Sequence, residues 1–80
     1  MSFMIEVLYK PPSDQQRESA IFDSVGQFGG RLDYREEPDK AGAGPVCLTY
    51  EFDDFEVADR AASSLRARGE SVKGPFDYGD

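Results

Sequence analysis

The stretch that decides the fold is Gly44-Pro45-Val46-Cys47-Leu48-Thr49-Tyr50-Glu51-Phe52-Asp53-Asp54. Large apolar residues occupy every second position from Val46 to Phe52, and smaller or polar residues stand between them. Strict alternation of this kind is typical of a β-strand with one buried and one exposed face. The two aspartates that follow favour the end of the strand and the start of a helix.

The N-terminal segment predicts a first strand with the same alternation. From Phe3 to Tyr9 the odd-numbered residues are expected to face a core, and the even-numbered residues are expected on the opposite face. Lys10-Pro11-Pro12 ends this strand, because proline has no N–H to donate to a strand ladder.

A helix is expected next. Ser13 and Gln16 have the spacing of a capping box, in which two side chains satisfy free N–H groups at the start of a helix. A stripe of apolar residues then recurs at helical spacing, which indicates one buried face. Its members are Ile21, Val25 and Phe28. Gly29-Gly30 predicts the left-handed exit with which many helices end.

Residues 31–37 predict a second strand, at an edge of the sheet. Leu32 and Tyr34 are expected on one of its faces. The charged residues expected on the other face are Arg31, Asp33 and Arg35. Alternating charges of this kind discourage pairing with the edge of another chain. Residues 38–45, rich in glycine, alanine and proline, then predict a loop.

A second helix and a fourth strand complete the chain. Asp53 or Asp54 is expected to cap the helix, which buries a face of small residues. That face consists of Ala58, Ala61, Ala62 and Leu65. Gly69 ends the helix, and residues 71–76 predict a short strand with Val72 turned inward. Gly74-Pro75 indicates an edge position, where proline is tolerated, and residues 77–80 are expected to fray.

The predicted order of elements is therefore strand, helix, strand, strand, helix, strand. With right-handed crossovers, this order gives a four-stranded antiparallel sheet of order 4-1-3-2 with both helices on one face. The predicted fold is a single α+β domain of ferredoxin-like βαββαβ architecture over residues 1–80. No layer is left to cover the second face of the sheet.

Composition narrows the range of functions. The chain has 80 residues, of which sixteen are acidic and nine basic, so its net charge is −7. A negative field repels phosphate backbones and anionic membranes, so we expect no nucleic-acid or membrane partner. One cysteine and no histidine cannot build a zinc site or an internal disulfide. Residues 1–6 carry no positive leader and no long apolar run, which predicts a soluble, cytoplasmic protein.

The uncovered face of the predicted sheet is the strongest candidate for a functional surface. An apolar centre within a charged border is typical of a protein interface, although solvated sheet faces are also common. The central strands are expected to contribute Met4, Glu6, Leu8, Cys47, Thr49 and Glu51. The edge strands are expected to contribute Arg31, Asp33, Arg35, Ser71 and Lys73.

About half of the chain resembles the RNA-recognition motif. Ile21-Phe22-Asp23-Ser24-Val25-Gly26-Gln27-Phe28-Gly29 is similar to the first helix of that family and its exit. Leu48-Thr49-Tyr50-Glu51, with Ala58 and Ala61-Ala62, is similar to its third strand and second helix. Members of the family stack bases on aromatic residues of the central strands. The matching positions here are Glu6, Pro45 and Cys47, with Ala43 at the basic position, so RNA binding is not expected.

The order of elements is also similar to that of ACT-type regulatory domains. These domains often pair through their sheets, and they bind amino acids or other small effectors near the loop after the first strand. That loop is Lys10-Pro11-Pro12-Ser13-Asp14 in this chain, and it lacks the glycine usual in the family. The resemblance implies effector binding at Asp14.

The same face offers two candidates for chemistry. Cys47 has no histidine base, so a nucleophilic thiolate would need Arg31 or Arg35 nearby to lower its pKa. Glu6 and Glu51 are expected on adjacent strands, where two close carboxylates can share a proton. The acidic groups at 36–39 and 53–56 lack the spacing of a calcium loop, so neither metal nor cofactor is expected.

These observations predict a non-enzymatic interaction module that self-associates through the uncovered face, as a homodimer. The alternative is a small-effector domain of ACT type with its site at Asp14. A carboxylate enzyme that uses Glu6 and Glu51 is the third hypothesis.

Overall fold

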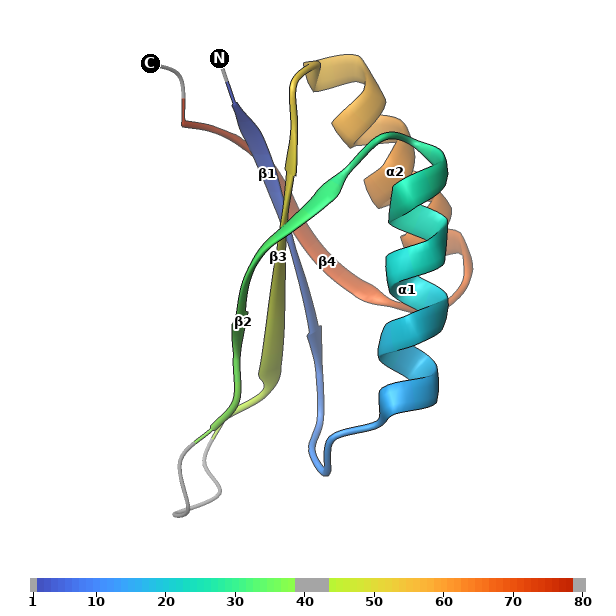
Figure 1. The fold of residues 1–80 in the computed structure, drawn as a ribbon, viewed down its shortest axis with the longest axis vertical. Coiled ribbons are helices and arrows are strands. Elements are labelled where there is room, and N and C mark those ends of the chain that lie inside the picture. The colour runs from blue at the N-terminus through green and yellow to red at the C-terminus, as the bar shows by residue number, and fades with distance from the viewer. Residues whose placement is uncertain (1, 39–43, 79–80) are drawn as a thin grey trace.

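The computed structural model describes residues 2–38 and 44–78. Within them the chain forms strand, helix, strand, strand, helix and strand, as predicted (Figure 1). The elements are β1 Phe3–Tyr9, α1 Gln15–Gln27, β2 Arg31–Glu36, β3 Val46–Phe52, α2 Phe55–Ala67 and β4 Ser71–Asp77.

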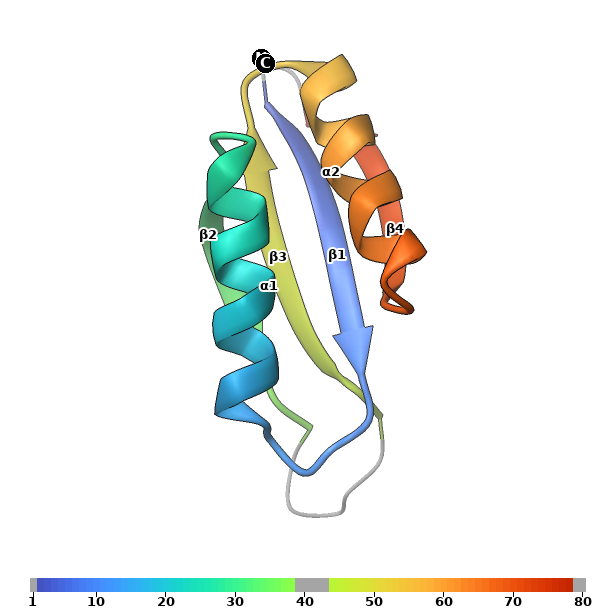
Figure 2. The same ribbon diagram turned by 90° about the vertical axis from the view of Figure 1, so that its right-hand side faces the viewer.

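The four strands form one antiparallel sheet in the order β2-β3-β1-β4. Read from the opposite edge, this is the predicted order 4-1-3-2. Both helices lie on one face of the sheet, α1 over the side of β2 and β3, and α2 over the side of β1 and β4 (Figure 2). The predicted ferredoxin-like α+β fold is therefore confirmed.

The core lies between the sheet and the helices. Burial alternates residue by residue along β1 and β3, with the odd residues of β1 and the even residues of β3 buried. The helices contribute Ile21, Val25, Ala58, Ala61, Ala62 and Leu65 to the same core. The alternation predicted for the two central strands is thus confirmed, and it leaves Glu6 and Cys47 on the face that the helices do not cover.

Both helices begin at an aspartate. Asp54 caps α2, as predicted, and accepts a hydrogen bond from the N–H of Glu56 at 3.2 Å. The predicted capping box at Ser13 is wrong, because Asp14 caps α1 and accepts from the N–H of Arg17 at 3.0 Å. The Ser13 hydroxyl instead donates to Glu37, just beyond β2.

The C-terminal strand extends further than predicted. Asp77 pairs with Phe3, and the N–H of Tyr78 donates to the carbonyl of Ser2 at 2.9 Å. The predicted tail at 77–80 therefore does not begin at Asp77. Residues 79–80, and residues 39–43 of the predicted loop at 38–45, lie outside the described residues.

Candidate functional site: the open face of the sheet

The register of the sheet brings twelve side chains to its uncovered side, since residues paired across antiparallel strands share a face. We refer to these twelve as the open face. They form three rows that cross the strands in the order β2, β3, β1, β4. The rows are Glu36, Cys47, Leu8 and Ser71; Tyr34, Thr49, Glu6 and Lys73; and Arg31, Glu51, Met4 and Phe76.

The structure brings together most of the predicted surface. The six predicted residues of the central strands all lie on the open face, and all are half-buried. Arg31 joins them from β2, where it is paired with Glu51. Ser71 and Lys73 join them from β4.

The prediction for β2 is wrong after its second residue. A bulge interrupts the register between Leu32 and Tyr34, so Asp33 has no partner on β3. One extra residue turns every later side chain of the strand to the opposite face. Tyr34 is therefore brought to the open face, whereas Arg35 is turned to the helix side.

On the helix side, Arg35 joins the strand to α1. Its guanidinium binds both carboxylate oxygens of Glu18, at 2.7 and 2.8 Å. The Tyr9 hydroxyl also donates to Glu18. Arg35 is the main reason that the pKa of Glu18 lies below its ordinary value. Arg35 and Tyr9 therefore have structural roles: through Glu18 they connect β2 and β1 to α1.

An aromatic residue on β4 completes the third row. The register between β4 and β1 shifts near Gly74, which has a φ of +105°. Phe76 is thereby placed opposite Met4, and its ring makes an edge contact with Tyr78, with the centroids 6.5 Å apart. Phe76 is 39% exposed, so it contributes apolar surface at this edge of the open face.

Tyr34 and Phe76 were not among the predicted site residues, yet they place one aromatic ring at each edge of the open face. Tyr34 is 59% exposed. A glycine followed by proline within a strand is a bulge signal, and it could have located Phe76. The sequence Leu32-Asp33-Tyr34 contains no comparable signal.

Cys47 is a half-buried strand residue whose thiol is not activated. Burial is the main cause that raises the pKa of the thiol, and the Glu6 carboxylate raises it further. Neither predicted activating cation is free. Arg31 binds Glu51 at 3.3 Å and Asp53 at 3.0 Å, and Arg35 lies on the other face. A raised pKa leaves less thiolate at neutral pH, which disfavours nucleophilic chemistry.

The carboxylates of Glu6 and Glu51 have different surroundings. The two residues lie on adjacent strands, but neither is the direct cross-strand partner of the other. Glu51 accepts a hydrogen bond from the Ser2 hydroxyl at 2.6 Å. Ser2, followed by Arg31, lowers the pKa of Glu51. A shared proton would instead raise the pKa of one carboxyl, so Glu51 is best described as an ionised group held by Ser2 and Arg31.

The remaining candidates have structural partners. Asp14 caps α1, and its own N–H donates to the Tyr9 hydroxyl at 2.9 Å. Among the acidic residues considered for a metal, Glu37 pairs with Arg35 and Asp53 pairs with Arg31. Asp39 lies outside the described residues.

A comparison of the chain with models of known protein families finds no match, and neither does a comparison with curated proteins. Neither helix of the described residues is long and apolar enough to cross a membrane.

Proposed function

We propose that this protein is a non-enzymatic interaction module that binds a second copy of itself through the open face. The observation that supports this proposal is the order of side chains in the three rows, which is complementary to itself. On the central strands, Met4, Leu8 and Cys47 supply half-buried apolar surface in the first and third rows, on either side of Thr49 and Glu6 in the middle row. An exposed aromatic ring stands at each edge, at Tyr34 and Phe76.

The proposed dimer has a twofold axis that runs parallel to the strands, between β1 and β3 and in the plane of contact. This axis places each row opposite the same row of the second copy, and it reverses the order in which the strands of the second copy are crossed. β3 therefore lies over β1 of the second copy, and β2 over its β4. Two sheets packed in this way are about 10 Å apart, and the side chains of both fill the space between them.

Under this symmetry each row faces the same row of the second copy, and the pairs are compatible except that Glu51, which keeps Ser2 and Arg31 of its own copy as partners, lies over the apolar Met4. In the first row, Cys47 lies over Leu8 of the second copy. In the second row, Tyr34 lies over Lys73 of the second copy, and in the third row Arg31 lies over Phe76 of the second copy. Both pairs place a cation against an aromatic ring. Because the contacts are isologous, every one of them occurs twice in the dimer.

Charges that lack partners within one copy are also accommodated. Glu6 and Lys73 are register partners on β1 and β4, but neither forms an ion pair with the other or with another described side chain. In the dimer Glu6 lies over Thr49, whose hydroxyl can donate to the carboxylate, and Lys73 lies over Tyr34. The interface thus gives both charged groups a partner.

The other simple twofold axis, perpendicular to the strands, is disfavoured. It would place each strand over the same strand of the second copy, so the middle row would face the middle row of the second copy. Glu6 would face Glu6, and Lys73 would face Lys73. Like charges placed opposite each other at an interface cost several kcal/mol. The parallel axis is therefore the arrangement that we propose.

Sedimentation equilibrium over a concentration series tests the proposal. Leu8→Asp adds a charge to a central strand of the open face, whereas the matched control Leu32→Asp adds the same charge to the helix side. We expect the parent and Leu32→Asp to reach the mass of a dimer and Leu8→Asp to stay monomeric.

Phe76→Ser serves as a milder second variant, because Phe76 lies at the sheet edge and is partly exposed. It should weaken the dimer without removing a buried residue. A parent that remains monomeric at millimolar concentration refutes self-association. Equal association of the parent and all three variants refutes the open face as the surface involved.

A further inference from the structure

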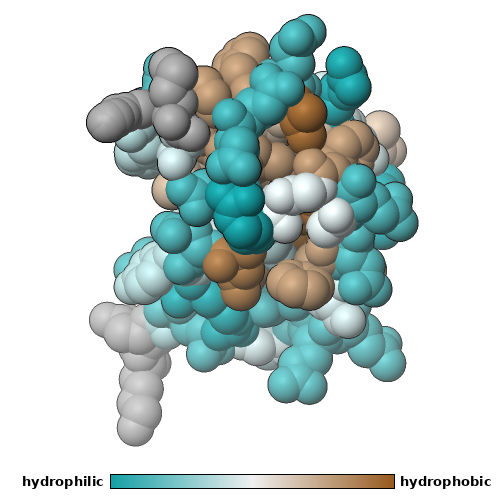
Figure 3. Space-filling model, turned by 45° about the horizontal axis from the view of Figure 1, so that its top comes forward, coloured by the Kyte–Doolittle hydropathy of each residue, from teal (hydrophilic) through white to brown (hydrophobic). Residues whose placement is uncertain are grey.

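The helix side of the sheet contains a hollow that the core does not fill. It lies between α1 and the strands β2 and β3, and its volume is about 390 Å³. Phe22 and Leu32 form its apolar rim and are 53% and 43% exposed. Figure 3 shows hydrophobic residues in the middle of this view of the molecule, crossed by a run of hydrophilic residues. We refer to this hollow as the α1–β2 groove.

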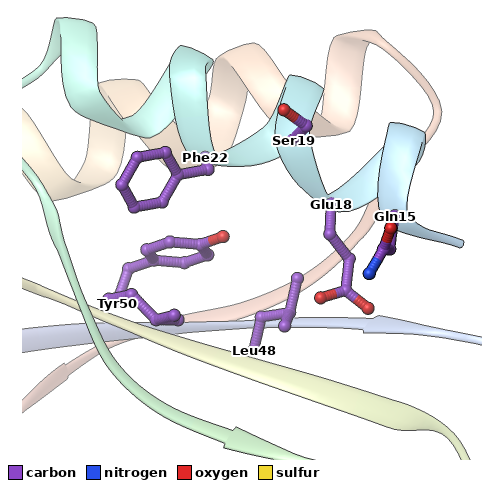
Figure 4. A pocket seen from close by; sticks show the side chains of 7 residues that line it. Gln15, Glu18, Ser19, Phe22, Leu48 and Tyr50 are labelled. Atoms are coloured by element: carbon purple, nitrogen blue, oxygen red, sulfur yellow. The ribbon is translucent and has the colours of Figure 1, made fainter. Parts of the chain in front are cut away.

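The floor of the α1–β2 groove holds a polar group without a partner. Tyr50 is only 1% exposed, yet its hydroxyl makes no hydrogen bond with any described residue. Every fully buried side-chain oxygen of the described residues has a hydrogen-bond partner. Because the Tyr50 oxygen has none, it is not fully buried and must be exposed to the groove. Figure 4 shows this hydroxyl pointing into the groove, with the Phe22 ring on one side and the Glu18 carboxylate on the other.

The Tyr50 hydroxyl is a donor that stays neutral. Burial, followed by the nearby Glu18 charge, raises the pKa of Tyr50 to about 12. Glu18 itself offers little to a ligand, because Arg35 and Tyr9 already occupy its oxygens. Gln15 and Ser19 on α1 also line the α1–β2 groove, and the Tyr50 hydroxyl is the buried O–H group of its floor that has no acceptor among the described residues.

The charge around the α1–β2 groove disfavours anions. Asp23 follows Phe22 on α1, and Asp33 follows Leu32 on β2. Neither carboxylate has an ion pair or hydrogen bond with the other described residues. These carboxylates neighbour the rim residues in sequence but do not line the groove, and with the net charge of −7 they create a negative field that disfavours an anionic ligand.

From these features we propose that the α1–β2 groove binds a small neutral molecule that consists of a flat apolar ring and a carbonyl oxygen. The ring lies against Phe22 and Leu32, and the carbonyl accepts a hydrogen bond from the Tyr50 hydroxyl. A cavity of about 150 Å³ holds a benzene molecule, and small-molecule pockets begin at about 300 Å³. The groove therefore has room for a ring and its polar substituent. It lies on the side of the sheet away from the open face, so it stays accessible in the proposed dimer.

Two probes of the same shape test this inference. Benzamide is a neutral ring with a carbonyl oxygen, and benzoate is its anionic counterpart. Each is titrated into the ¹⁵N-labelled protein while the amide chemical shifts are followed. We expect benzamide to cause saturable shifts in α1 and in β2 around Leu32, and benzoate to cause none there.

Tyr50→Phe isolates the hydroxyl. It removes only an oxygen that has no partner in the described residues, so the fold and the stability should be retained. We expect it to weaken benzamide binding about two- to tenfold, the range of one neutral hydrogen bond. Leu32→Asp should abolish the binding and leave the mass of the dimer unchanged.

Three results would overturn the inference. The first is that benzamide causes no saturable shifts at the α1–β2 groove. The second is that benzoate binds there as well as benzamide does. The third is that Tyr50→Phe binds benzamide as tightly as the parent does, which would exclude the hydroxyl as the donor.

Discussion

Replacement of Gly30 by alanine is expected to destabilise the protein through a steric clash in the core. A Cβ at Gly30 would lie 2.4 Å from a methyl carbon of Val25 and 2.6 Å from two ring carbons of Phe52. Both neighbours are 1% exposed, so neither has free space to move into. Overpacking of this kind costs about 1–3 kcal/mol. For a domain of this size, each kcal/mol lowers the Tm by about 4–8 °C.

Gly26→Ala is the matched control. Gly26 lies within α1, is exposed, and has nothing within 4 Å of an added Cβ. Alanine is favoured over glycine in a helix interior by about 0.5–1 kcal/mol, so this variant should be more stable than the parent.

Urea unfolding followed by circular dichroism measures both variants. All samples need the same protein concentration, because dimerisation contributes to apparent stability. We expect the midpoint to fall for Gly30→Ala and to rise for Gly26→Ala. A Gly30→Ala midpoint equal to that of the parent, or shifts of both variants in the same direction, would contradict the packing described for this glycine.

Three further predictions concern single side chains. Tyr9→Phe should cost about 1.5–3 kcal/mol in urea unfolding, because the hydroxyl donates to the Glu18 carboxylate and accepts from the N–H of Asp14, whereas Tyr50→Phe should cost nothing. The Glu18 pKa is lowered in the folded state, so its stabilisation is present above the unfolded pKa of about 4.5 and is lost as the pH falls through the folded value. Arg35→Met should therefore reduce the loss of stability on acidification in thermal unfolding, and an unchanged acid profile would exclude this ion pair as a cause. Cys47 should react with iodoacetamide more slowly in the folded protein than in urea, because burial raises its pKa, and equal rates would contradict that environment.

The central strands could be predicted because burial on one face imposes a period of two. The alternation along 3–9 and 46–52 specifies which side chains face the helices, and it placed Glu6 and Cys47 correctly. Four strands and two helices in this order then leave few right-handed arrangements. The fold followed from these local patterns together with the crossover rule.

The edges of the sheet could not be predicted in the same way. All six residues of β2 are exposed, so burial imposes no alternation that would reveal its register. The bulge at Asp33 therefore does not alter the pattern of apolar residues, and the sequence predicts the wrong face for Arg35. On β4, Gly74-Pro75 indicates an edge strand, and it also coincides with the register shift that places Phe76 on the open face.

Capping shows a second limit of local patterns. Ser13 and Asp14 are both favourable helix caps, and spacing to Gln16 favours the serine. The choice depends on Glu37, which accepts from the Ser13 hydroxyl although it lies 24 residues further along the chain. A contact between such distant residues cannot be read from the residues around the helix start.

The most direct test of the proposed dimer is an isotope-filtered NOE experiment on a mixture of labelled and unlabelled protein, which detects only contacts between copies. The twofold axis parallel to the strands predicts NOEs from the Leu8 methyls to Cys47 and from the Tyr34 ring to the Lys73 side chain. The absence of any NOE between copies, or NOEs that join Tyr34 to Tyr34, would contradict the proposed pairing of the open face.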